Sequence, residues 1–80
     1  MLLKPVTSEK AVKMIDVENT LIFEAPRNSR KDEIKKEVET LFSVKVTKVR
    51  TLIHGNVKTA FVRLNKSNPA SDIASKLGII

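Results

Sequence analysis

The sequence predicts an α+β fold, in which a single four-stranded, mostly antiparallel sheet is packed with helices. Two observations support this class. Stretches with the apolar spacing of strands alternate with stretches of helical spacing, in the order β-α-β-α-β-β-α. The chain has 80 residues, which suffice for one thin core, so residues 1–80 are expected to form a single domain.

The N-terminal segment predicts a short strand followed by a short helix. Leu2-Leu3 can form only a short strand, because Pro5 stops it. Thr7 or Ser8 then offers a hydroxyl group that can cap a helix. One side of this helix carries Ala11, Val12 and Ile15.

The next strand is expected over Thr20–Ala25, where β-branched and aromatic residues are concentrated and Pro26 ends the run. Leu21 and Phe23 would lie on one face and Ile22 on the other. Apolar residues on both faces indicate a central strand.

A turn at residues 26–29 leads into the helix with the clearest pattern. Ser29 is the expected N-cap, with Asp32 three residues later. Helical spacing then predicts a buried stripe of Ile34, Val38, Leu41 and Phe42.

The third strand breaks its own alternation. Val44 and Val46 share one parity, whereas Val49 and Ile53 share the other. A β-bulge or a late strand start near Thr47 would reconcile the two sets.

A tight hairpin is expected at His54-Gly55-Asn56, followed by a strand over Lys58–Leu64. On that strand Ala60, Val62 and Leu64 would face one way, and Thr59, Phe61 and Arg63 the other.

The last helix is expected to start at Asn68-Pro69, with Pro at its first position. Ile73 and Leu77 would form its buried stripe, and Gly78 followed by Ile79 fits a left-handed C-terminal cap.

Positive charge is concentrated in one part of the chain. The formal net charge is +6, and the sequence between Thr40 and Ser71 has no Asp or Glu, while acids and bases cancel elsewhere. The basic residues of this window alternate with apolar strand residues, which predicts a basic sheet surface suited to a polyphosphate partner such as nucleic acid. They are Lys45, Lys48, Arg50, Lys58, Arg63 and Lys66.

The residues offer little for catalysis, so we do not expect an enzyme. The chain has no Cys, and its one His, His54, lies in a predicted turn without a neighbouring acid. Two glycines cannot form a phosphate-binding loop. A salt-bridged solvent face is the simpler reading of Asp32, Glu33, Glu37 and Glu39. No cofactor, metal or small-molecule substrate is expected.

The first residues are too short an apolar run for a signal peptide, and no run approaches membrane-spanning length, so a cytoplasmic protein without membrane insertion is expected. Phe23 and Phe42 fit core packing. Phe61 shares a face with Arg63, where it could contact RNA or be buried by a further helix.

Three segments of the sequence resemble the family of large-subunit ribosomal protein twenty-three. The run from Lys58 to Asn65 (KTAFVRLN), with Ile73 eight residues later, is similar to the family's signature strand. Residues 5–11 (PVTSEKA) resemble its N-terminal helix start, and residues 34–52 its central helix and third strand. Thr59 departs from the basic residue frequent there. The short turn at residues 54–56, the ending at residues 77–80 and the lack of a long basic N-terminal extension make the chain look archaeal.

The resemblance implies a ribosome-bound structural protein that holds large-subunit ribosomal RNA (rRNA) near the peptide exit tunnel, beside neighbouring ribosomal proteins. Lys and Arg would contact phosphates, while Asn and Thr would fix register on the RNA backbone. The expected rRNA-binding residues are Lys4, Arg27, Asn28, Arg30, Lys48, Arg50, Thr51, Lys58, Arg63 and Lys66.

Ser8-Glu9-Lys10 matches a motif of this family at the tunnel rim. The resemblance implies that Glu9 docks factors that meet the nascent chain, such as the signal recognition particle. Otherwise Glu9 is a first-turn acid that complements the helix dipole.

A second function class stays open. A free protein–protein interaction or regulatory module, whose basic sheet meets an acidic partner, would use the same strand pair. Sedimentation of cell extract separates the two, because only a ribosomal protein would migrate with large subunits.

Overall fold

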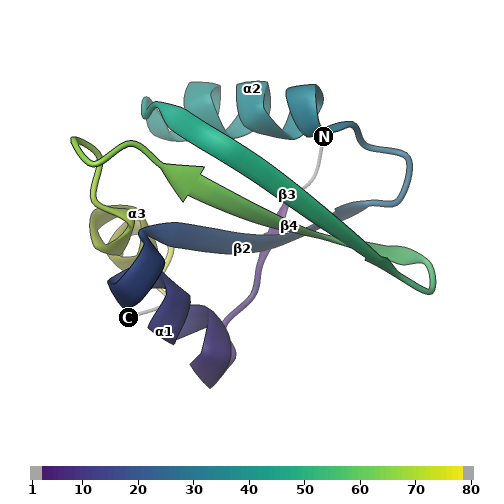
Figure 1. Cartoon of the computed structure of the whole chain (residues 1–80), viewed down its shortest axis with the longest axis horizontal. Helices are drawn as coiled ribbons and strands as arrows, with labels where there is room; N and C mark the ends of the chain where they lie inside the picture. Colours follow the sequence, from purple (N-terminus) through teal and green to yellow (C-terminus); the bar gives the residue numbers. More distant parts are fainter. Residues whose placement is uncertain (1–2, 79–80) are drawn as a thin grey trace.

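The computed structural model describes residues 3–78 and has the predicted order of elements (Figure 1). The strands are β1 (Lys4–Pro5), β2 (Thr20–Pro26), β3 (Val46–His54) and β4 (Val57–Leu64). The helices are α1 (Glu9–Glu18), α2 (Lys31–Phe42) and α3 (Ala70–Lys76). The α+β class and the β-α-β-α-β-β-α order are therefore confirmed.

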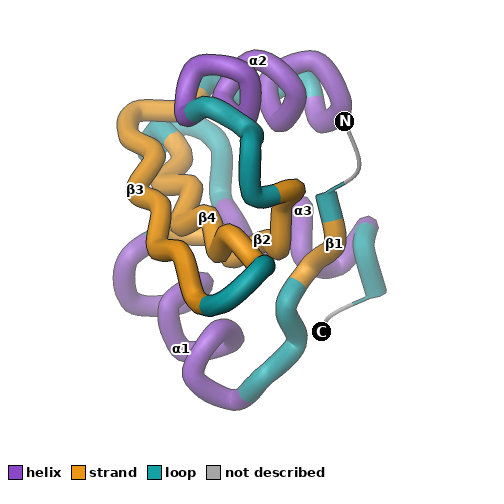
Figure 2. Tube along the Cα trace, turned by 90° about the vertical axis from the view of Figure 1, so that its right-hand side faces the viewer, coloured by secondary structure: helices purple, strands orange, loops and turns teal. Residues whose placement is uncertain are grey.

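The four strands form one sheet in the order β1-β2-β4-β3, and every neighbouring pair is antiparallel. β2 is a central strand, as its two apolar faces predicted. Figures 1 and 2 show α2 on one side of the sheet and α1 on the other, with α3 beside the start of β2. The helices therefore cover the two faces unequally, which leaves part of one face open.

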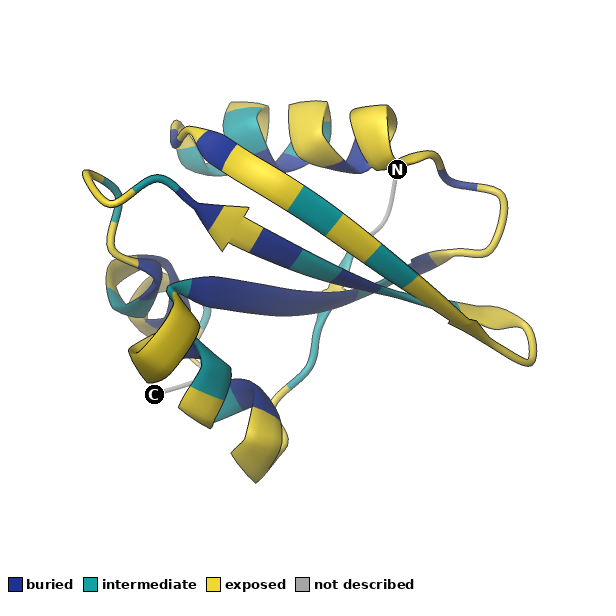
Figure 3. Cartoon of the chain, in the orientation of Figure 1, coloured by how far each residue is buried: buried dark blue, intermediate teal, exposed yellow. Residues whose placement is uncertain are grey.

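The core lies between the sheet and α2, with α3 closing one end. Leu21 pairs with Val62 and Phe23 with Ala60, so these residues share a face, and all four are at most 1% exposed. Ile34 and Val38 of α2 pack against them without solvent exposure. Figure 3 shows β2 buried along most of its length and β3 largely exposed.

Aromatic packing joins α2 to the sheet. The rings of Phe23 and Phe42 stack with their centroids 6.2 Å apart, which confirms that both residues serve packing. Leu41, predicted in the same stripe, is 58% exposed. It lies in the last turn of α2, where Phe42 makes the contact with the core instead.

The start of the first strand was predicted wrongly. Leu3 lies outside any strand and Leu2 outside the described residues, while β1 pairs Lys4 with Glu24 and Pro5 with Phe23. An edge strand tolerates Pro because one of its sides needs no N–H group. Ser8 caps α1 as expected, since its hydroxyl oxygen accepts from the Ala11 N–H at 3.2 Å.

Two other helix starts are shifted by one residue. The N-cap of α2 is Arg30, whose N–H donates to the Glu33 carboxylate at 2.9 Å, while the Ser29 N–H closes the preceding turn on the Pro26 carbonyl. Pro69 is the N-cap of α3 rather than its first helical residue. Gly78 is left-handed with φ 76°, as predicted, and Ile79 lies outside the described residues.

The bulge and the hairpin confirm the reading of the third and fourth strands. The β3–β4 register shifts between Val46 and Lys48, so Thr47 is the extra residue. His54 pairs with Val57 across the two-residue turn Gly55-Asn56. Gly55 has φ 64°, a conformation that costs little without a side chain.

Asn19, at the left-handed C-cap of α1 (φ 52°), joins three elements. Its side-chain amide nitrogen lies 3.2 Å from the carbonyl oxygens of Leu64, Asn65 and Asn68. Its side-chain oxygen accepts from the Ala70 N–H at 2.6 Å, where α3 begins. One side chain thus supplies the cap of α3 and fixes the end of β4 beside α1.

Replacing Asn19 by Ala should lower the free energy of unfolding by about 2 kcal/mol, because several partly buried backbone groups lose their partner. Urea unfolding measures this change. Asn19→Gly keeps the left-handed backbone accessible, so it should lose somewhat less. A change below about 0.5 kcal/mol in Asn19→Ala would contradict the assigned role.

Candidate nucleic-acid interface

The face of the sheet opposite the core, called the outer face below, carries cations on its two last strands. Residues directly opposite each other in an antiparallel pair share a face. The register therefore places these side chains on the outer face in three rows: Lys4, Glu24, Thr59 and Leu52; Ile22, Phe61 and Arg50; Thr20, Arg63 and Lys48.

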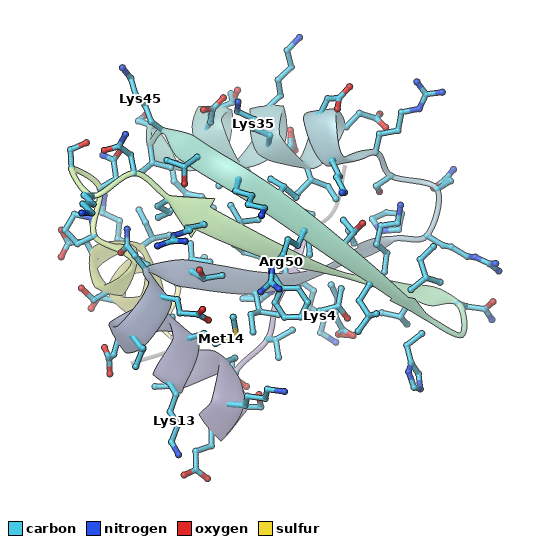
Figure 4. The ribbon with its side chains drawn as sticks, viewed as in Figure 1. Lys4, Lys13, Met14, Lys35, Lys45 and Arg50 are labelled. Carbon is cyan, nitrogen blue, oxygen red and sulfur yellow. The ribbon has the colours of Figure 1, made fainter. Side chains whose placement is uncertain are left out.

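The centre of the outer face is a cation on an aromatic ring. The Arg50 guanidinium carbon lies 5.2 Å from the centre of the Phe61 ring, directly across the β3–β4 pair. Figure 4 shows Arg50 on the side of the sheet away from α2, which carries Lys35. The attraction between the guanidinium group and the ring holds Arg50 against the sheet. Phe61 is half-buried by this contact, and a further helix does not enclose it.

A hollow of about 230 Å³ lies beside this pair. Arg50, Arg63 and Lys48 give it positive charge, and Phe61 gives it an aromatic surface. Glu18, the last residue of α1, brings one acid to the same hollow, and Thr20 completes the lining.

A neighbouring groove of about 500 Å³ extends the positive surface toward the loop after β4. It brings Lys66 together with Lys48 and Arg63, three of the predicted binding residues. Thr47 lines the same groove, and its hydroxyl donates to the Arg63 carbonyl at 3.1 Å. The bulge therefore helps to place the cations of β3 and β4 side by side.

Sequence reasoning missed the lysines of α2. Lys31, Lys35 and Lys36 line a groove of about 550 Å³ together with Lys48 of β3, and the acids Asp32 and Glu39 line it as well. Of the acids on this helix, Glu33 and Glu39 accept backbone N–H groups, from Arg30 at 2.9 Å and Val46 at 3.1 Å, and the salt-bridged helix face stays a prediction. The spacing of Lys31 and Lys35, one turn apart and next to a basic strand, was the available signal.

Comparison of the sequence with known proteins indicates the family to which this chain belongs. The family model described as ribosomal protein L23 matches residues 1–71. The chain belongs to the L23 family. Large ribosomal subunit protein uL23 of Trypanosoma brucei brucei is 43% identical over 77 residues, which are 95% of this chain and 47% of that protein. The chain thus spans about half the length of this relative. The predicted resemblance is confirmed, and L23 proteins are structural proteins of the ribosome.

Two predicted binding residues of β3 and β4 lie on the core face of the sheet. Thr51 pairs with Ala60, so it belongs to the core face. Lys58 pairs with Ala25 and Ile53 on that same face, and its ammonium group donates to the Ser29 carbonyl. The stretch between Thr40 and Ser71, which has no Asp or Glu, thus places basic residues on both faces of the sheet rather than on one continuous surface.

The other predicted residues surround the domain. Arg27 and Asn28 are exposed in the turn after β2, and Arg30 is exposed at the start of α2. Lys4 is exposed on β1, in the same row as Glu24. Glu9 is the exposed first residue of α1, a position that fits both docking and the helix dipole.

Among residues 3–78, no group of three or more His, Cys, Asp or Glu side chains could hold a metal ion. His54 is exposed at the hairpin turn. Within the same range, none of the helices combines the length and apolar character needed to cross a membrane.

The Lys58 contact predicts a structural role for this residue. Lys58→Met keeps most of the aliphatic stem but removes the charged donor from the Ser29 carbonyl, so we expect the free energy of unfolding to fall by about 1 kcal/mol. Urea unfolding measures the loss. Lys45→Met, at an exposed position, is the matched control and should change stability little.

Proposed function

We propose that the chain is a structural constituent of the large ribosomal subunit and binds its rRNA near the polypeptide exit tunnel. The observation that carries the proposal is the grouping of Lys48, Arg50 and Arg63 around Phe61 on the open outer face. Membership of the L23 family supplies the ribosomal context. Neighbouring large-subunit proteins would cover other surfaces.

The chemistry of the outer face suits an RNA backbone. β3 and β4 contribute no Asp or Glu, so the cations of these strands outnumber the one acid, Glu18, that lines the same hollow. Arg50 and Arg63 can each make paired hydrogen bonds with phosphate oxygens, and Lys48 and Lys66 act as point charges. Exposed Arg27, Asn28 and Arg30 offer further contacts beyond the hairpin end of the sheet.

Binding to deproteinised large-subunit rRNA in the presence of excess transfer RNA tests the proposal. We expect saturable binding with a log–log salt slope of about −3 to −5, because about five phosphates would be neutralised. If transfer RNA abolished the binding, the surface would be a non-specific polycation and an acidic protein would be the better partner.

The outer face can be tested separately with matched charge changes. The triple variant Lys48→Gln, Arg50→Gln, Arg63→Gln should weaken binding and make the salt slope shallower by about 2 to 3, since three phosphate contacts are removed. The control removes three exposed cations elsewhere, with Lys10→Gln, Lys13→Gln and Lys76→Gln. Equal losses in both triple variants would argue against a specific outer-face site.

Glu9 is proposed to dock nascent-chain factors, with the signal recognition particle as the first candidate. Its exposure at the start of α1 leaves the carboxylate accessible. Glu9→Lys should weaken recruitment of the particle to intact ribosomes but leave incorporation of the chain into subunits unchanged. Cosedimentation measures both. Asp16→Lys, an exposed acid on the same helix, is the control, and unchanged recruitment by Glu9→Lys would remove the docking role.

A further inference from the structure

The contact between Arg50 and Phe61 holds a guanidinium group over an aromatic ring at the edge of the hollow. The two residues are direct partners across the β3–β4 pair, and the guanidinium group lies over the ring. A guanidinium plane held in this way can stack on a nucleobase with its other side. A side chain used only for phosphate contact would not need an aromatic partner beneath it.

The acid in the hollow argues against an occupant that offers only the phosphates of the RNA backbone. Glu18 lines the hollow with three cations, yet a carboxylate repels phosphates. It also ends α1, where a negative charge opposes the helix dipole. Glu18 offsets part of the repulsion among the three cations, and its carboxylate can also accept N–H groups of a base.

The dimensions of the hollow limit its occupant. Sites for drug-sized ligands have volumes of about 300–1,000 Å³, and this hollow has about 230 Å³. One planar ring system fits this space better than a paired duplex, whose bases are enclosed between two backbones. Unpaired bases are also the usual targets of sequence-specific RNA recognition.

We propose that the hollow receives one unpaired guanine of the RNA. The base stacks on the guanidinium plane of Arg50, and its two Watson–Crick N–H donors, on N1 and N2, bond to the Glu18 carboxylate. Lys48 and Arg63 bind the flanking phosphates. Guanine is selected because the other three bases offer one donor group at most on that edge. This inference rests on the proposed rRNA function and adds base readout to it.

Chemical probing with kethoxal tests the inference, because this reagent modifies N1 and N2 of unpaired guanines. The probe is deproteinised large-subunit rRNA, bound by the full chain with transfer RNA as competitor. We expect the wild-type chain to protect at least one unpaired guanine that Glu18→Ala and Arg50→Lys both leave reactive. Asp16→Ala, the matched acid control on α1, should protect it fully.

Affinity gives a second readout. Arg50→Lys keeps the charge but loses the flat plane, so its salt slope should stay unchanged while its dissociation constant rises about tenfold, as the loss of a stacked base usually causes. Circular dichroism checks that each variant is folded. Both substitutions concern exposed residues, so folding should be preserved.

The outcomes separate this inference from the function on which it rests. Saturable, competitor-resistant binding without any protected guanine, or with protection that survives in both variants, would overturn the base-binding hollow and leave the rRNA function standing. If the wild-type chain showed no competitor-resistant binding, the proposed function would fail, and the inference would fail with it.

Discussion

The antiparallel pairing of β2 with β4 determines where the other parts of the molecule lie. Because successive strand residues point to opposite faces, this one register sends Leu21, Phe23 and Val62 into the core and Phe61 and Arg63 to the outer face. A slip by one residue would exchange the two sets. The core therefore fixes the position of the cations on the outer face, and the proposed binding surface needs no separate scaffold.

Much of the fold could be predicted because strand alternation and turn chemistry are local signals. The parity of β2 and β4, the bulge at Thr47 and the turn at Gly55 all follow from nearby residues. The predictions that were wrong concern the residues at which helices and strands begin or end. Ser29 has good capping chemistry, but the turn uses its N–H and places it before the cap. Leu41 has the right spacing, yet its helix ends where Phe42 takes the contact.

The binding surface was predictable in composition but only partly in geometry. Most basic residues of the stretch between Thr40 and Ser71, which has no Asp or Glu, lie on β3 and β4, and the alternation on β4 already implied that Lys58 shares the face of Ala60. A count of the charges between Thr40 and Ser71 does not show that the basic residues are divided between the two faces of the sheet. The lysines of α2 were missed because helix periodicity shows which residues are exposed, whereas proximity of Lys31 and Lys35 to Lys48 arises only when α2 packs beside β3. The spacing of Lys31 and Lys35 indicates a basic helix face, but it does not show which strand that face lies beside.

The position of β3 at the sheet edge has a consequence for the protein before it meets its partner. An edge strand exposes unpaired backbone groups, and β3 also carries exposed Leu52 and Ile53 near the hairpin. Such an edge can pair with another copy and start aggregation. Lys48 and Arg50 on the same strand repel a second copy, and the bulge at Thr47 interrupts the regular ladder. The charges proposed to bind RNA therefore also oppose the edge-to-edge pairing of two copies through β3.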